Sequence, residues 1–415
     1  MPQRVLFLSN GHGEDLNATL VLQALQKLAS DIEPAAMPIV GTGKAYQKLG
    51  VPIIGPTQQL PSGGFNYINF GRLLNPVNWW RDTNPVSLLK DLFSGLIGLT
   101  WNQWQAVRRY SQSCDLLFAT GDVVPILFAH LTQRPFLVFL VSTSSYYEGK
   151  AHLPLLAQWA LRSPRCHQII TRDRKTAQDL QRRGFARTQF WGYPIMDMLT
   201  PTGHPLHCSP PAALVALLPG SRLPEAQTNF GLMLELCLAI TQRRPAHFHA
   251  ALVPNFTTTH LQTLADTHGW DATYPGKLKK AGTTVHYHYN AFVDILHQCD
   301  LVVGMAGTAV EQAVGLGKPV IQIPGPGPQF TYLFAEAQMR LLGASVVTVG
   351  NRPATAQTLL TAAAKIDQTL NDPSYLQQCG LNGRERVGEP GGSQAIAVAI
   401  LKTLKQLSQE IPTPR

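Results

Sequence analysis

The sequence predicts an α/β protein built from two doubly wound parallel-sheet domains. Short apolar segments alternate with helical patterns along the chain, and these segments are too uniformly apolar to leave one face in water. Strands buried on both faces and joined by helices form parallel sheets. A chain of 415 residues also exceeds the size that one hydrophobic core usually organises. Two domains of this kind are therefore expected.

The predicted strands fall into two groups separated by a linker. The linker, "MLTPTGHPLHCSPP" at 198–211, is rich in Pro, Gly and His and has no apolar periodicity. It separates a predicted N-terminal domain, 1–197, from a predicted C-terminal domain, 212–388. Strands are expected at 4–9, 35–40, 115–120, 135–141, 166–171 and 188–192 before the linker, and at 213–220, 247–253, 283–288, 300–304, 319–324 and 344–349 after it.

Composition limits the class of protein. Hydrophobic content of 45% and charged content of 14% are typical of a globular chain. No apolar run approaches the ~18–20 residues of a membrane-spanning helix, and the first residues resemble a strand more than a signal peptide, so a cytoplasmic protein is expected. The six cysteines follow neither zinc nor disulfide spacing. The net charge of +9 indicates an anionic partner, although no basic stripe of the kind that binds nucleic acid is present.

The segment 59–112 departs from the alternation. Residues 59–86 are rich in aromatic residues and turn formers, and a long helical pattern follows at about 87–112. Aromatic rings beside cations are typical of segments that dock at a membrane interface, but the helical pattern is equally compatible with core packing. With the positive net charge, the joint interpretation is peripheral attachment to an anionic membrane. The residues concerned are Phe65, Tyr67, Phe70, Arg72, Trp79, Trp80, Arg81, Leu88, Leu89, Leu92, Phe93, Leu96, Ile97, Trp101, Arg108 and Arg109.

A glycine turn follows the first predicted strand. In "NGHGED", Gly11 and Gly13 separate the strand from a helix, so unpaired backbone N–H groups lie at the carboxyl edge of the sheet. Parallel α/β sheets bind ligands at that edge. Such a turn is equally compatible with tight packing alone. His12, Glu14 and Asp15 place polar groups at the same tip.

Two similar turns occur in the second half. In "LLPGSRLPEA", Gly220 and Ser221 precede Arg222, whose guanidinium is suited to a diphosphate, and Glu225 follows. The alternative for Arg222 is an ion pair or a helix terminus. In "LVVGMAGTAVEQ", Gly307 and Thr308 offer N–H and hydroxyl donors to a phosphate. Glu311, one turn further on, is placed to accept hydrogen bonds from ribose, although an acidic residue in a first turn is also favoured by the helix dipole.

These motifs together resemble a known family. "LLPGSRLPE", "GMAGTAVE" and "GKPVI", preceded by "NGHGED", "ATGDVVP" and "FWGYPIMDML", resemble GT-B glycosyltransferases, most closely the lipid-A-disaccharide synthase family. The resemblance covers nearly the whole chain. It implies two Rossmann-like domains that face a central cleft, with a C-terminal segment, 389–415, crossing back to the N-terminal domain. The second half matches the family better than the first, so a nucleotide-sugar donor is implied while the acceptor, the sugar and the oligomeric state stay open.

The resemblance also implies residue roles. Asp122 is the expected base, with His12 as the alternative, while Glu14 and Asp15 orient the acceptor or stabilise charge. Asp122 is equally suited to capping the helix that follows it. Phe292 lies in the segment expected to bind the base of the nucleotide, or packs in the core, and Gln329 is expected near the sugar. The remaining donor-site residues are Gly11, Gly13, Gly220, Ser221, Arg222, Glu225, Gly307, Thr308 and Glu311.

The expected reaction is inverting transfer of an N-acetylglucosamine-type sugar from UDP to a lipid acceptor at the inner face of the cytoplasmic membrane. No DxD-type or His/Asp metal cluster follows a predicted strand, so the expected mechanism uses neither a metal nor a further cofactor. Two alternatives remain. One is an isomerase of the nucleotide-sugar 2-epimerase type, and the other is a GT-B-like binding subunit without catalytic activity.

Overall fold

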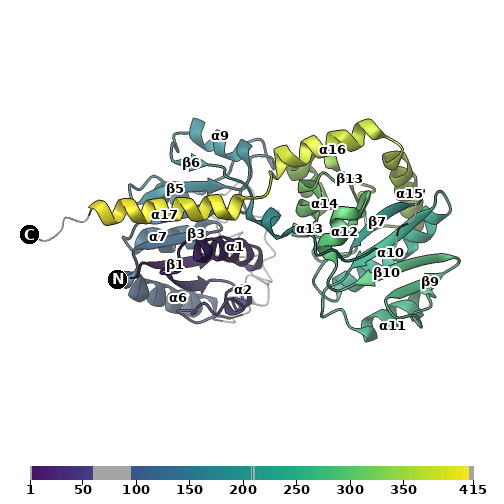
Figure 1. Cartoon of the computed structure of the whole chain (residues 1–415), viewed down its shortest axis with the longest axis horizontal. Helices are drawn as coiled ribbons and strands as arrows, with labels where there is room; N and C mark the ends of the chain where they lie inside the picture. Colours follow the sequence, from purple (N-terminus) through teal and green to yellow (C-terminus); the bar gives the residue numbers. More distant parts are fainter. Residues whose placement is uncertain (1, 59–94, 207, 209–210, 411–415) are drawn as a thin grey trace, which may run out of the picture. The chain divides into compact units, whose positions relative to one another are not determined.

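The structure is a computed structural model that describes residues 2–58, 95–206, 208 and 211–410 (Figure 1). The predicted aromatic residues between 59 and 94 lie outside the described residues. The chain divides into two compact units, which are treated separately below. Unit 1 comprises Met1–Asp197 and Pro390–Arg415, and unit 2 comprises Met198–Glu389.

Unit 1 contains a parallel sheet with the strand order β2-β1-β3-β4-β5-β6. Its strands form because nearly every residue in them is buried, as in β3 and β4, where all side chains are out of water. The register pairs Phe7 of β1 with Phe118 of β3, and their rings meet edge to face. The strands are β1 (Arg4–Ser9), β2 (Glu33–Pro38), β3 (Leu116–Thr120), β4 (Phe136–Leu140), β5 (Cys166–Thr171) and β6 (Thr188–Gln189).

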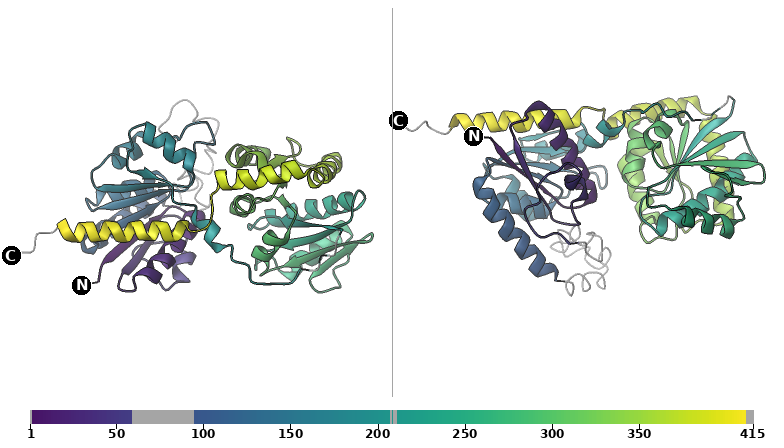
Figure 2. Two further views of the ribbon diagram at one scale, coloured as in Figure 1. Left: turned by 45° about the horizontal axis from the view of Figure 1, so that its top comes forward. Right: turned by 60° about the horizontal axis from the view of Figure 1, so that its bottom comes forward.

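Helices cover both faces of this sheet. The C-terminal helix α17 (Gly392–Glu410) packs on α1 (His12–Leu28) over one face (Figures 1 and 2). The other face carries Leu6 and Leu8 of β1 in one apolar cluster with side chains of α6 (Leu96–Tyr110), α7 (Val123–Leu131) and α8 (Leu155–Leu161). The short α2 (Lys44–Gln47) follows β2, and α9 (Arg174–Arg182) joins β5 to β6.

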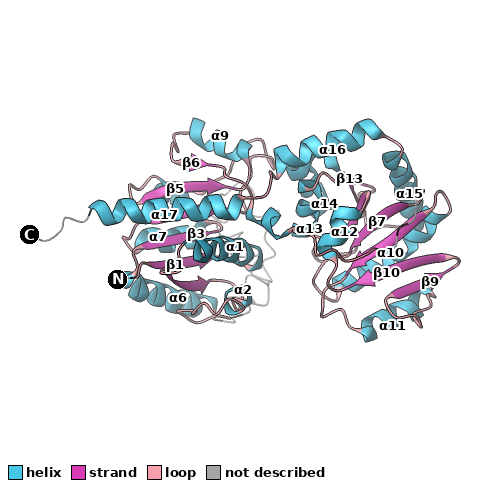
Figure 3. Ribbon diagram, in the orientation of Figure 1, coloured by secondary structure: helices cyan, strands magenta, loops and turns pink. Residues whose placement is uncertain are grey.

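Unit 2 contains the order β13-β12-β11-β7-β8-β10-β9. All neighbouring strands are parallel except β9, which runs antiparallel to β10 at one edge (Figure 3). The strands are β7 (Ala213–Leu218), β8 (Ala246–Ala251), β9 (Lys277–Lys280), β10 (Thr283–His288), β11 (Leu301–Gly304), β12 (Val320–Gln322) and β13 (Val346–Thr348).

The helices of unit 2 also lie on both faces of its sheet. Side chains of α10 (Glu225–Thr241), α11 (Thr258–His268) and α15 (Ala356–Leu370) share one buried cluster with Val215 and Leu217 of β7. On the other face, α16 (Pro373–Arg386) packs against α13 (Thr308–Gly315). The remaining helices are α12 (Phe292–Gln298) and α14 (Tyr332–Leu342).

The predicted fold class is confirmed, since both units are parallel α/β sheets covered by helices. Strands 4–9, 166–171 and 283–288 have the predicted bounds, while most others are shorter by a few residues at their ends. Strand β9 was not predicted. Its sequence, KLKK, has the charge that edge strands use against unwanted pairing, so it does not produce the apolar run by which the other strands were recognised.

Candidate functional site

The sheet topologies place the predicted residues at two equivalent positions. In unit 1 the connections of β1 and β3 leave in opposite directions, to β2 and β4; in unit 2 those of β7 and β11 leave toward β8 and β12. Parallel sheets bind ligands outside the carboxyl ends of two such strands. The turn 10–15 and Asp122 follow the pair in unit 1, and the turns 219–225 and 305–308 follow the pair in unit 2. Topology therefore favours the same two edges as the motifs.

In unit 1, Asp122 lies against the end of β1. Asn10 Nδ2 donates a hydrogen bond of 2.8 Å to Asp122 Oδ1. The close approach depends on Gly121, whose φ of +132° is in the region that favours glycine. A Cβ at Gly121 would lie 2.9 Å from the Asn10 Cβ, closer than two such atoms can approach. The two strand ends therefore meet because residue 121 has no side chain.

A second carboxyl group, that of Glu14, lies beside Asp122. Ser142, just after β4, donates its hydroxyl to Glu14 Oε1 over 2.5 Å. Burial, and secondly the negative charge of Glu14, raise the pKa of Asp122 from its usual 3.8 to about 7, while nearby backbone N–H groups oppose the shift. A carboxyl group with a pKa near neutrality is suited to accept a proton at physiological pH. Asn10 and Ser142 were not predicted, because their sequence neighbourhoods carry no chemical motif.

Asp15 lies in a different environment from Asp122. Its carboxyl group is buried and accepts a hydrogen bond of 2.5 Å from Ser9, whose hydroxyl also meets the Tyr46 hydroxyl at 2.9 Å. Burial raises the pKa of Asp15 to about 7, with the charge of Glu14 adding to the rise and the Ser9 hydrogen bond opposing it. Because these contacts are internal, the geometry assigns Asp15 to the packing of α1 against α2.

The remaining residues of the first turn are more open. His12 is exposed, and its ring lies against Gly41, where an added Cβ would be 2.9 Å from His12 Cε1. Gly11 is the residue before α1, and Gly13 faces open space. The structure thus brings Glu14 toward Asp122 and leaves His12 at the surface of the same tip.

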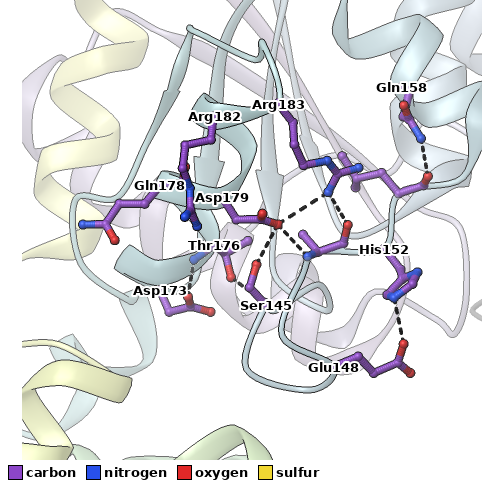
Figure 4. Close-up of polar contacts among 12 residues, drawn as sticks. Ser145, Glu148, His152, Gln158, Asp173, Thr176, Gln178, Asp179, Arg182 and Arg183 are labelled. Atoms are coloured by element: carbon purple, nitrogen blue, oxygen red, sulfur yellow. Dashed lines mark hydrogen bonds and ion pairs between the residues drawn. The ribbon is translucent and has the colours of Figure 1, made fainter.

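The loop that carries Ser142 is clamped by α9 (Figure 4). Asp179 Oδ2 accepts from Ala151 N at 2.7 Å and from Ser145 Oγ at 3.1 Å. Burial alone would raise the pKa of Asp179, but these hydrogen bonds and Arg183 together hold it below its usual range. Asp173 caps α9 through Thr176 N and also accepts from the Ser144 hydroxyl at 2.7 Å. A rigid helix therefore holds this loop in place.

In unit 2, the turn after β7 crosses the end of β11. Gly220 has a φ of +103°, and a Cβ there would lie 3.1 Å from the Met305 carbonyl oxygen. Ser221 and Arg222 follow and are exposed. Gly307 precedes α13, Thr308 is its first residue, and Glu311 lies in its first turn, all three half-buried. The predicted diphosphate residues therefore share one edge of one sheet.

Glu225 has an internal role in this geometry. Its Oε1 accepts hydrogen bonds from the backbone N–H groups of Gln329 and Phe330, at 2.9 and 2.6 Å. The carboxyl group is buried. Glu225 thus holds the loop that presents Gln329, and the prediction that it contacts the donor directly gains no support from these contacts.

A chain of buried amides fixes the turn before α13. Thr348 Oγ1 donates to Gln322 Oε1 at 3.0 Å, and Gln322 Nε2 donates to Gln338 Oε1 at 2.5 Å. Gln338 Nε2 then donates to the carbonyls of Ala306 and Gly307, at 3.1 and 3.2 Å. Every donor in the chain has an acceptor, which is the condition under which a buried polar network specifies one conformation.

We expect the Gln338→Met substitution to weaken nucleotide binding. It leaves the two carbonyls and Gln322 Nε2 without their partner, at a cost of about 1–3 kcal/mol in the free energy of unfolding, and it frees the turn. Calorimetric titration with UDP should show about tenfold weaker binding. Gln357→Met, on the exposed side of α15, is the matched control. Unchanged UDP affinity in Gln338→Met would contradict this role.

The predicted base-binding segment is anchored at α12. Phe292 begins the helix and is half-buried. Asp294 is buried and accepts from the Thr202 hydroxyl at 2.7 Å and from the backbone N–H groups of Thr202, Gly203 and His204. The Thr202 hydrogen bond, with those N–H groups, holds the pKa of Asp294 below its usual range although burial opposes this. The segment is therefore fixed to the start of the predicted linker.

The helices α6 and α8 expose large apolar side chains. On α6, Leu96 and Leu99 are buried, whereas Ile97 and Trp101 are 72% and 60% exposed. On α8, Leu155, Leu156 and Trp159 are exposed, Leu155 at 81%. Both alternatives for this predicted helix therefore hold, one for each of its faces. The exposed side chains Ile97, Trp101, Leu155, Leu156 and Trp159 are called the α6–α8 patch below.

Searches for two further features among the described residues were negative. No helix within 2–58, 95–206 and 211–410 combines the length and the apolar character needed to cross a membrane. In that same part of the chain, no group of three or more His, Cys, Asp or Glu side chains is arranged to hold a metal ion.

Comparison with known proteins supports the resemblance seen in the sequence. No family model matches the chain. The lipid-A-disaccharide synthase of Geobacter sulfurreducens is 26% identical over 232 residues, which are 52% of this chain and 57% of the relative. The chain thus matches little more than half the length of this curated relative.

Solved structures show the same fold. The spinosyn rhamnosyltransferase SpnG, complexed with thymidine diphosphate, aligns with a TM-score of 0.59 at 14% identity, covering 97% of this chain and 100% of SpnG. UDP-GlcNAc 2-epimerase from Neisseria meningitidis, bound to UDP-GlcNAc, aligns with a TM-score of 0.54 at 12% identity, covering 97% of this chain and 100% of the epimerase. The fold is thus that of GT-B glycosyltransferases and the related epimerases.

Proposed function

We propose that this protein is a glycosyltransferase that moves a sugar from a UDP-sugar to a lipid acceptor, in the manner of a lipid-A-disaccharide synthase. The observation that carries the proposal is the pair of switch-point edges: one holds a carboxyl group with a pKa near 7, and the other holds an arginine beside a glycine turn and a helix start. The similarity to the Geobacter enzyme and the nucleotide-bound structural neighbours support this assignment.

Unit 2 would bind the donor. The guanidinium of Arg222 and the N–H groups at the start of α13, with the Thr308 hydroxyl, would neutralise the diphosphate. Glu311 would accept hydrogen bonds from ribose, and backbone groups near Phe292 would contact the uracil. Gln329, on the loop held by Glu225, would contact the sugar. This set of donors would stabilise the departing UDP without a metal ion.

Unit 1 would activate the acceptor. The acceptor hydroxyl oxygen attacks the anomeric carbon while the bond from that carbon to the diphosphate oxygen breaks, so UDP leaves with the electron pair. Asp122 takes the hydroxyl proton in the same step. Attack from the side opposite UDP inverts the anomeric configuration. Glu14 lies beside Asp122 and would contribute negative charge near the developing cation.

A product analysis tests the proposal. Purified protein is incubated with a panel of UDP-sugars and extracted membrane lipids in detergent, and the lipids are analysed by mass spectrometry. The expected result is a lipid whose mass rises by one hexose or N-acetylhexosamine residue, with one UDP released per product. No mass increase with any donor would contradict the proposal.

The epimerase fold neighbour supports a second candidate, isomerisation of the nucleotide sugar itself. That reaction needs no acceptor. Turnover of UDP-N-acetylglucosamine alone, followed by NMR of the sugar protons, would favour it over transfer. A lipid acceptor requirement would exclude it.

We also propose that the α6–α8 patch docks on an anionic membrane. The exposed apolar side chains would enter the interface, and the exposed Arg108 and Arg109 at the end of α6 would meet anionic headgroups. The positive net charge of the chain acts in the same direction. Such docking would bring the protein to a lipid acceptor without a spanning helix.

We expect the double substitution Ile97→Ser and Trp101→Ser to weaken vesicle binding at least about tenfold, because two large apolar side chains no longer leave water. Sedimentation with vesicles containing phosphatidylglycerol measures the binding. Leu381→Ser, at a residue of α16 that is 63% exposed, is the matched control. Equal partitioning of the double variant and the control would contradict the assignment of this face.

A further inference from the structure

Asn10 is a buried amide at the end of β1, and it contacts a carboxyl group from another strand. It is 3% exposed, and its Nδ2 donates to Asp122 Oδ1 over 2.8 Å. The orientation of the amide follows from chemistry, because an ionised carboxylate only accepts hydrogen bonds and must therefore face the NH₂ group. The contact thus favours the ionised form of Asp122.

The other end of the same amide gains little from burial. Asn10 Oδ1 is buried and has no donor among the described residues. Such an acceptor lowers stability, so packing alone does not account for an amide here. Incompletely satisfied polar groups are concentrated at functional sites. The contact with Asp122 is the remaining contribution that this side chain makes.

Glu14 acts on Asp122 in the opposite sense. Its negative charge disfavours ionisation of Asp122 and, after burial, is the larger of the two causes that raise the pKa of that group. Ser142 holds Glu14 by a hydrogen bond of 2.5 Å, and the Ser142 loop is fixed in turn by α9. The charge is therefore held at a defined place.

The other titratable groups near this tip act elsewhere. Asp15 and Tyr46 meet at Ser9, which points to the opposite side of β1 from Asn10 because successive side chains alternate. His12 lies against Gly41. The first residues of α7, Val123 and Val124, and Ser142 after β4 are uncharged. Among the described residues, Glu14 is therefore the charged group that bears on Asp122.

We propose that Asn10 and Glu14 are opposed positioning residues that together set the protonation of Asp122, Asn10 through an N–H donor and Glu14 through its charge. The inference rests on the proposed function, since it assigns to Asp122 a proton-accepting task. It extends that function by naming two residues that act through Asp122 and by giving each a sign.

The test uses two variants whose effects differ in direction. In Asn10→Ala the ionised form loses a donor, so the acid limb of the pH profile of kcat/KM should move to higher pH by about one unit. In Glu14→Gln a negative neighbour is removed, so the limb should move to lower pH. A general loss of structure would not shift the profile in opposite directions. Asn10→Ser, with less packing lost, should repeat the shift of Asn10→Ala.

A second measurement is independent of turnover. Carbon NMR of protein labelled at aspartate carboxyl groups follows the titration of Asp122, with Asp122→Asn assigning the signal. The two variants should shift this titration as they shift the pH profile. Asn17→Ala is the matched control, because the Asn17 amide donates to the Gly13 carbonyl and should leave the Asp122 titration unchanged.

The outcomes separate the two proposals. If the wild-type protein forms no glycosylated product yet the NMR titrations shift as expected, the proposed function fails and the inference about Asp122 stands. If product forms but Asn10→Ala and Asn10→Ser leave both the pH profile and the titration of Asp122 in place, the inference is overturned. Shifts of the same sign in the Asn10 and Glu14 variants would also overturn it.

Discussion

Replacing Asp122 with Asn is expected to lower the rate of glycosyl transfer more than ~100-fold. The amide cannot take the proton of the acceptor hydroxyl, so the base is lost while the shape of the side chain is kept. UDP affinity should not change, because the donor residues lie in unit 2. In the wild type, kcat/KM should rise with pH through about 7, since the base acts only when ionised. Single-turnover assays with the acceptor and UDP titration measure the two effects separately.

The same substitution tests the alternative, that Asp122 is only a helix cap. Asp122 directly precedes α7, but its side chain makes no capping hydrogen bond in the structure. Asn caps helices about as well as Asp, so a pure cap would lose little activity. Asp372→Asn, at the cap of α16, is the matched control, because there the side chain does accept from Tyr375 N.

Stability should move in the direction opposite to activity. The pKa of Asp122 is about 7 in the folded protein and near its usual 3.8 in the unfolded chain. Between these values the folded state binds more protons, so the free energy of unfolding falls as pH rises, and ionisation above pH 7 opposes folding. At pH 8, Asp122→Asn should therefore unfold at the same temperature as the wild type or at a higher one. Full activity in this variant would favour a binding subunit without catalytic activity.

The features that sequence could predict are those encoded locally. Strands buried on both faces produce apolar runs, and parallel strands in a doubly wound order place every following turn at one edge. For this reason the glycine turns at Gly11, Gly220 and Gly307 were correctly expected at the carboxyl ends of β1, β7 and the neighbouring β11. The exposed Ile97 and Trp101 of α6 were also within the predicted helix.

The features that sequence could not predict depend on contacts between distant residues. Ser142 meets Glu14 across 128 positions, and Glu225 binds the amide of Gln329 across 104. Neither a serine after a strand nor a glutamate at a helix start carries information about its partner. The same holds for Gln322 and Gln338, which look like ordinary polar residues until β12 and α14 bring them together. The sequence thus located the edges of the site, while the structure identified what holds them.

Replacing Arg222 with Ala is expected to weaken UDP binding about 10- to 100-fold, because a hydrogen bond between charged groups is worth about 1.5–3 kcal/mol. The loss should be smaller for UMP, which lacks the second phosphate. Arg222 is exposed, so the thermal midpoint should change little. Arg222→Lys keeps the charge but loses the planar fork and should recover only part of the affinity.

The matched control separates a local contact from a general effect of charge. Arg243 is also exposed and follows the far end of α10, about 25 Å along the helix from its start. Arg243→Ala removes the same charge from unit 2 and should leave UDP affinity unchanged at physiological salt, where charges that far apart are screened. If both variants weaken binding equally, the positive charge of the unit attracts UDP without a specific site at the β7 edge. If neither does, the diphosphate is held elsewhere, and the assignment of the donor to this edge is wrong.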